Sequence, residues 1–135
     1  MSVQWSTSLR NALLDAWESA IGTGAKIYVR TGSAPATCAL ADSGTLLAQF
    51  DLASDWASPA SGGVKGLASL PLSATAVAAG TAGHYRIKDS AGTTCHEQGA
   101  VSATGGGGDI TIDSLDISVG QEVQLTAWSK VAPGA

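Results

Sequence analysis

The chain has 135 residues, which is enough for one domain. Its formal net charge is −4 and its mean hydropathy is +0.17. Its seven basic residues are scattered, so the composition argues against nucleic-acid binding. No apolar stretch approaches the ~20 residues of a membrane span, and the first residues lack the basic and apolar regions of a secretory signal. We therefore expect neither nucleic acid nor a membrane among the partners.

One amphipathic helix is predicted over about residues 7–21. Apolar residues at every fourth position predict a single buried face: Leu9, Leu13, Trp17 and Ile21. Ser6 or Thr7 can cap the start of this helix, and Gly22 suits the left-handed turn that ends it.

The rest of the chain alternates apolar and polar residues in the manner of β-strands. The expected strands lie at about 26–30, 46–52, 64–72, 84–88, 95–103, 109–113 and 123–127. Pro71 suggests an edge or a bulge in the third of these, and the turn at 90–92 predicts a hairpin. The apolar parity switches at Ser114, which calls for a turn or bulge there.

This pattern predicts a mainly β fold, an antiparallel β-sandwich or jelly-roll-like barrel with one N-terminal helix. We expect a single domain over 1–135, with an N-terminal segment and helix at 1–24, a β-sandwich at 25–130 and a flexible tail at 131–135. Beside the helix face, the predicted core includes Phe50, Trp56, Tyr85 and Ile87.

Three acidic residues follow a run of four glycines: Asp109, Asp113 and Asp116. A calcium site needs several oxygen ligands that converge on one point, and this spacing does not match an EF-hand loop. These residues are therefore weak metal candidates, and solvated carboxylates are the expected alternative. The glycine run lacks the lysine of a phosphate-binding loop, which favours a flexible turn.

The sequence offers little for catalysis. His84 and His96 are the two histidines, and no nucleophile-elbow motif is present. Cys95 and His96 are adjacent, so in a strand their side chains point to opposite faces. We expect no enzyme, no catalytic residue and no cofactor. Cys38 and Cys95 are expected to be buried thiols, with a disulfide as the alternative.

Two tryptophans lie near the termini, Trp5 and Trp128. We expect both to be exposed and to contact a protein partner, since exposed aromatic residues mark interaction surfaces. Stacking against a carbohydrate is the alternative.

Short motifs follow one another in a characteristic order: Leu9-Arg10-Asn11-Ala12, Ile21-Gly22, Arg30-Thr31-Gly32, Cys38, Ala41-Asp42-Ser43-Gly44-Thr45, Ser54-Asp55-Trp56, Thr81-Ala82-Gly83-His84-Tyr85-Arg86-Ile87-Lys88, Cys95-His96 and Gly105 to Asp109. In this order, from about residue 9 to 128, they resemble a family of small proteins encoded among the structural genes of tailed bacteriophages and prophages.

The resemblance implies a structural protein of the virion, and the chain looks most like a capsid decoration, or cement, protein. Such proteins bind the outside of the expanded shell as dimers or trimers and bridge major capsid subunits. The resemblance therefore implies synthesis in the host cytoplasm, a place on the capsid surface and the major capsid protein as partner. Two alternatives remain: a tail or head-to-tail connector component, and a module that binds host carbohydrate or a receptor.

Overall fold

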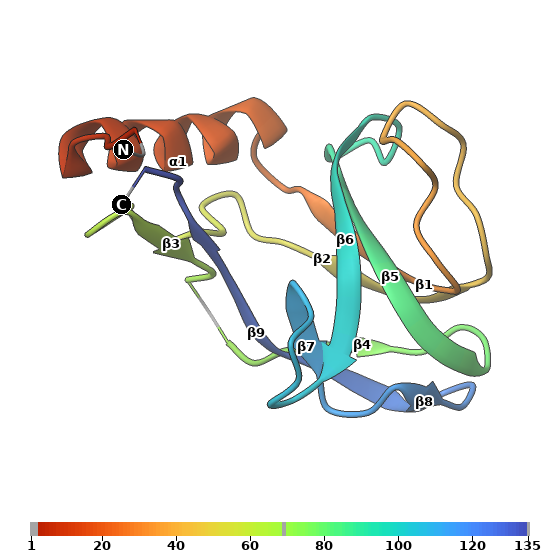
Figure 1. Cartoon of the computed structure of the whole chain (residues 1–135). Coiled ribbons are helices and arrows are strands. Elements are labelled where there is room, and N and C mark those ends of the chain that lie inside the picture. Colours follow the sequence, from red (N-terminus) through yellow and green to blue (C-terminus); the bar gives the residue numbers. More distant parts are fainter. Residues whose placement is uncertain (1–2, 69, 135) are drawn as a thin grey trace.

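One helix and nine strands form the fold of this computed structural model, which describes residues 3–68 and 70–134 (Figure 1). In chain order they are α1 (Thr7–Ile21), β1 (Lys26–Thr31), β2 (Leu46–Asp51), β3 (Val64–Gly66), β4 (Leu72–Thr75), β5 (Gly80–Lys88), β6 (Cys95–Ala103), β7 (Ile110–Ile112), β8 (Asp116–Ile117) and β9 (Glu122–Val131). The predicted class, mainly β with one N-terminal helix, is confirmed.

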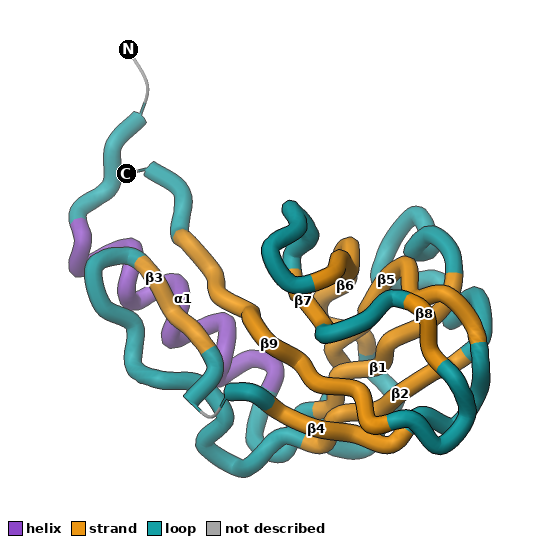
Figure 2. The backbone as a smooth tube through the Cα atoms, turned by 90° about the horizontal axis from the view of Figure 1, so that it is seen from below, coloured by secondary structure: helices purple, strands orange, loops and turns teal. Residues whose placement is uncertain are grey.

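The strands form one large curled sheet in the order β2-β1-β5-β6-β7-β9-β3, with β4 beside β9 and β8 beside β5. All pairs are antiparallel except β6 and β7, which run parallel. The sheet curls until the chain after β4 reaches β2, where the Val77 amide donates to the Leu47 carbonyl at 2.8 Å (Figure 2). This curling encloses the core and gives the sandwich-like form that the sequence predicts.

The helix has the predicted ends. The Ser6 hydroxyl accepts a hydrogen bond from the Leu9 amide, and Gly22 ends the helix with a φ of 93°. Within the described residues, no helix is both long and apolar enough to cross a bilayer.

The predicted helix face is partly wrong, because Leu9 and Leu13 are 46% and 41% exposed. The buried residues are instead Arg10, Leu14 and Ile21, with Trp17 half-buried beside them. In an α-helix with 3.6 residues per turn, residues spaced by four positions do not stay in line. Each step rotates the side chain by about 40° around the helix axis. The mixed spacing of 10, 14, 17 and 21 stays on one side of the helix and faces the sheet.

The segment expected as one strand at 64–72 is two strands, and this prediction is also wrong. Both pair with β9, but at its two ends: Val64 lies opposite Val131, and Leu72 lies opposite Leu125. The chain therefore leaves β9 and returns to it. Pro71 stands at the return, where it has no amide hydrogen to donate to a neighbouring strand.

Three tryptophans pack together between α1 and the sheet. The ring centroids of Trp17 and Trp56 are 5.2 Å apart, those of Trp17 and Trp128 4.8 Å, and those of Trp56 and Trp128 5.4 Å. Trp56 is buried, as predicted, as are Phe50, Tyr85 and Ile87. The sequence predicts Trp128 on the surface, and this prediction is wrong, because Trp128 is only 3% exposed. The reason is that β9 extends beyond it and turns this side chain toward the helix.

Hydrogen bonds fasten the segment that was expected to be a flexible tail. The Ala132 amide donates to the Gly63 carbonyl, and the Trp5 amide donates to the Gly134 carbonyl at 2.8 Å. The Arg10 guanidinium also donates to the Ala132 carbonyl. The two described ends of the chain consequently lie side by side (Figure 2). Residues 1, 2 and 135 lie outside the described residues.

Candidate functional site

A 14-residue loop at 32–45 joins β1 to β2 without helix or strand. Loops of this length are uncommon in compact domains and are usually either functional or disordered. The loop lies against the outer face of β5 and β6, on the side opposite α1 (Figure 1). Its residues are mostly small, so hydrogen bonds rather than apolar burial must hold its shape.

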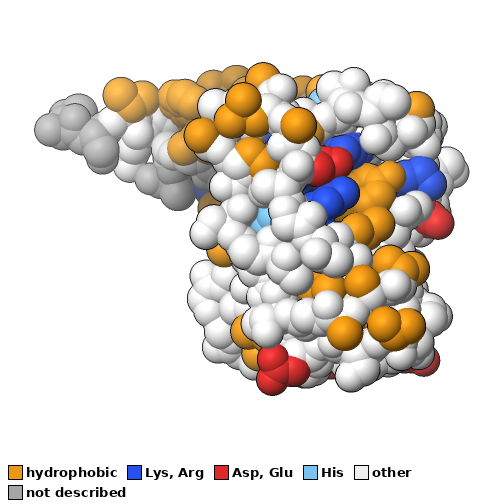
Figure 3. Space-filling model, turned by 90° about the vertical axis from the view of Figure 1, so that its right-hand side faces the viewer, with side chains coloured by type: hydrophobic (Ala, Val, Ile, Leu, Met, Phe, Trp, Pro, Cys, Tyr) orange, Lys and Arg blue, Asp and Glu red, His pale blue; other side chains and the backbone are white. Residues whose placement is uncertain are grey.

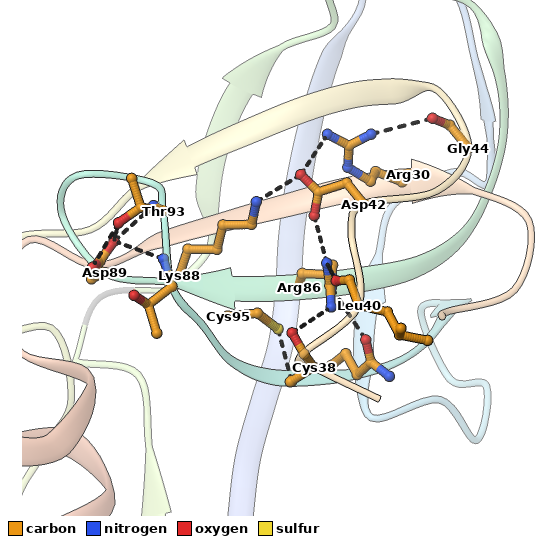
Figure 4. Close-up of polar contacts among 12 residues, drawn as sticks. Arg30, Cys38, Leu40, Asp42, Gly44, Arg86, Lys88, Asp89, Thr93 and Cys95 are labelled. Atoms are coloured by element: carbon orange, nitrogen blue, oxygen red, sulfur yellow. Dashed lines mark hydrogen bonds and ion pairs between the residues drawn. The ribbon is translucent and has the colours of Figure 1, made fainter. Parts of the chain in front are cut away.

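Arg86 of β5 holds the loop (Figure 4). Its side chain is almost fully buried, with the residue 1% exposed, and its guanidinium donates to five acceptors. These are the carbonyls of Thr37, Cys38 and Leu40 in the loop, the Asp42 carboxylate, and the Gln98 side chain of β6. Hydrogen bonds that involve a charged group are among the strong ones in proteins. Arg86 therefore acts as an internal anchor.

Asp42 adds a second anchor at the end of the loop. Its carboxylate lies 2.6 Å from Arg86 Nη1, 2.6 Å from Lys88 Nζ and 3.3 Å from Arg30 Nη2. Partial burial opposes its ionisation, but the hydrogen bonds from Lys88 and Arg86 and the charge of Arg30 outweigh this and lower the pKa of Asp42 to about 2. The loop is thus clamped to β1 and β5 at neutral pH.

The clamped loop presents three apolar side chains to solvent: Ala39, Leu40 and Ala41, called the loop surface below. Beside it is a hollow of about 410 Å³, lined by the loop, Lys88, Thr93 and Cys95. Figure 3 views this side of the molecule and shows basic and acidic side chains next to hydrophobic ones. The arrangement suits recognition by shape and charge.

A second polar cluster surrounds Glu97 of β6. Its carboxylate accepts hydrogen bonds from the Trp17 indole at 3.1 Å and the Tyr85 hydroxyl at 2.6 Å, and pairs with Lys130 at 2.9 Å. Burial, and then the neighbouring Glu97 carboxylate, raise the pKa of Tyr85. Because its partners come from α1, β5 and β9, Glu97 joins the helix to the sheet.

The weak metal candidates are not brought together. Asp109 accepts from the Ala100 amide, Asp113 from the Gln124 amide and Asp116 from the Thr81 hydroxyl, and these partners lie on three different strands. In the described part of the chain, no three His, Cys, Asp or Glu side chains are grouped to hold a metal ion.

The predicted pair of exposed tryptophans is not a shared surface, since Trp128 is buried and only Trp5 is exposed. The structure instead exposes Leu9 and Leu13 together with Trp5; these three residues are called the helix surface below.

The sequence patterns predict neither Arg86 nor Glu97 as the centre of a cluster. The sequence holds two weak signals: the gap between the first two strands contains a single acid, Asp42, and Arg86 lies between the apolar residues Tyr85 and Ile87. No protein-family model, curated protein or solved structure matches the chain. The resemblance to phage structural proteins therefore stays a prediction from the sequence motifs.

Proposed function

We propose that this protein is a structural component of a tailed-bacteriophage virion, most closely a capsid decoration protein that binds the outer shell and bridges major capsid subunits. The order of the sequence motifs supports this proposal, as does the mainly β fold with fixed outer surfaces. Decoration requires no chemistry, only a surface complementary to the shell. Because a shell repeats each binding position many times, modest contacts add up.

The helix surface is the observation that carries the proposal. Leu9 and Leu13 lie one helical turn apart and are nearly half exposed. The other side of the same helix is fixed: Arg10 reaches the Ala132 carbonyl, and the buried Lys65 amine pairs with Asp15 at 2.7 Å and Glu18 at 2.8 Å. Because this helix is rigid, its exposed apolar side chains cannot turn inward, and only a partner that covers them removes them from water and lowers the free energy.

The first experiment counts copies in particles made by the genome that encodes this chain. A decoration protein should be present in hundreds of copies, because it follows the symmetry of the shell. A tail or connector component should be present in a few to a few tens of copies, and densitometry of the virion proteins separates the two. Particles without the chain would refute both assignments.

The second experiment tests the helix surface. Shells made without this chain are mixed with the purified protein and sedimented. Leu9→Glu combined with Leu13→Glu should abolish co-sedimentation. The control combines Val77→Glu with Val119→Glu, which alters two residues that are 62% and 69% exposed elsewhere, and should bind normally. Both variants should keep their stability within about 0.5 kcal/mol, since the altered side chains are exposed. Equal binding by both would refute the role of the helix surface.

A further inference from the structure

The two cysteines of the chain meet although they lie 57 positions apart. Cys38 belongs to the loop and Cys95 begins β6, and their sulfur atoms are 2.7 Å apart as free thiols (Figure 4). A disulfide bond is about 2.0 Å long, so the sulfur atoms need to approach by only about 0.7 Å. Both cysteines also line the open hollow beside the loop, where a small reagent can reach them.

Their positions are set by the anchors already described. Arg86 Nη2 donates to the Cys38 carbonyl at 3.0 Å, which fixes the loop at that residue. Cys95 lies opposite Lys88 in the β5–β6 pair, next to the turn that joins these strands. Once one of two thiols held in this way carries a mixed disulfide, the other attacks it far faster than a free thiol in solution would, because folding has already brought the two sulfur atoms together.

We propose that Cys38 and Cys95 form a dithiol–disulfide site that reacts with low-molecular-weight disulfides and, when oxidised, fastens the loop covalently to β6. In the first step the Cys38 thiolate attacks one sulfur of the small disulfide, forming a mixed disulfide and releasing one thiolate. In the second step the Cys95 thiolate attacks the Cys38 sulfur and releases the second thiolate. The protein loses two electrons and two protons, and one small disulfide is reduced to two thiols.

The environment of Cys95 supports this order of attack. The Cys95 thiol donates its hydrogen bond toward the Cys38 sulfur. Burial, and then this contact with Cys38, raise the pKa of Cys95 above its usual value. Cys95 therefore stays protonated while Cys38 meets the reagent. Once Cys38 carries the mixed disulfide, Cys95 loses its proton to solvent and its thiolate attacks the neighbouring Cys38 sulfur.

The effect that oxidation would have on the loop surface in a particle rests on the proposed function. In a reducing cell the loop would be held by hydrogen bonds and the ion pairs of Asp42, whereas a particle released into an oxidising medium would carry a loop that is covalently closed. The chemistry itself does not depend on a virion, so it can be tested on the isolated protein.

The test treats the reduced protein with excess oxidised glutathione, quenches with acid and records the intact mass. The expected product has lost two hydrogens, carries no glutathione, titrates for no free thiol and returns to two thiols with dithiothreitol. A large chain loop is closed, so the melting temperature should rise by roughly 10 °C. Stable glutathione adducts, disulfide-linked dimers or two unreacted thiols would each refute the site.

Two variants serve as controls. Cys95→Ser removes the second thiol and should stop at one glutathione adduct on Cys38. Cys95→Ser combined with Thr94→Cys moves the thiol by one residue, which turns it toward a different side of the chain. This variant keeps two thiols but should also retain glutathione. If this variant formed a disulfide as readily as the unaltered protein, the contact between Cys38 and Cys95 would not be the cause of disulfide formation.

Discussion

Replacement of Arg86 by methionine tests whether one side chain holds the loop at 32–45. Methionine keeps much of the length and volume of the buried stem, so the change removes mainly the guanidinium. That group donates to three loop carbonyls and to the Asp42 carboxylate, and the residue is almost fully buried. In Arg86→Met these four acceptors lose their shared donor at once.

The expected loss of unfolding free energy is about 3 kcal/mol. Removal of one partner from a buried ion pair costs about 3–5 kcal/mol. The lower end of this range applies here, because the loop is at the surface and can swing out, so that its carbonyls and Asp42 bind water instead. The free energies of the five hydrogen bonds, four to the loop and one to Gln98, do not add, because all five are lost with one guanidinium group.

Urea unfolding followed by tryptophan fluorescence measures the stability, and hydrogen exchange of the loop amides measures its release. We expect both to change in Arg86→Met. Arg86→Lys restores a positive charge near Asp42 but cannot reach three carbonyls, so it should recover less than half of the loss. A loss below about 1 kcal/mol together with unchanged loop exchange would show that Arg86 does not hold the loop.

Two further predictions concern the clamp and the tryptophan cluster. The folded-state pKa of Asp42 is about 2, below its unfolded value of about 3.9, so its contribution is present above pH 4 and is lost as the pH falls toward 2. The melting temperature should therefore fall more steeply over this window in the unaltered protein than in Asp42→Asn, and parallel curves would contradict the clamp. Trp17→Ala should cost about 3–5 kcal/mol in urea unfolding, and Trp17→Phe less, because it loses mainly the hydrogen bond to Glu97. A loss below about 1 kcal/mol in Trp17→Ala would mean that this face of the helix is not packed within the subunit.

Local signals predict the elements of this fold well. The cap at Ser6 and the glycine at Gly22 set the ends of the helix, and the two-residue alternation locates β1, β2, β5 and β6 to within a few residues. These features depend on neighbours in the sequence, which a single sequence displays. The split of the segment at 64–72 depends on where β9 runs, and nothing local displays that.

The site could not be predicted for a related reason. Alternation in β5 correctly puts Tyr85 and Ile87 on the core side and assigns His84 and Arg86 to the other face. A period of two separates the two faces of a strand but does not say whether the second face meets water or another part of the chain. Here the loop covers that face, so His84 and Arg86 are buried as well.

The composition of the chain explains why the peripheral segments are attached by buried cations. Ala, Gly, Ser and Thr account for 69 of the 135 residues, so each segment buries little apolar area. Arg10 attaches the C-terminal segment, Lys65 attaches the helix and Arg86 attaches the loop. Apolar residues in these places could give equal stability, because a buried ion pair is often no more stable than its hydrophobic replacement. Hydrogen bonds from a buried cation are directional, however, and they fix where the helix surface and the loop surface lie. For a protein whose proposed function depends on presenting those surfaces in register with a repeating shell, fixed position matters more than additional stability.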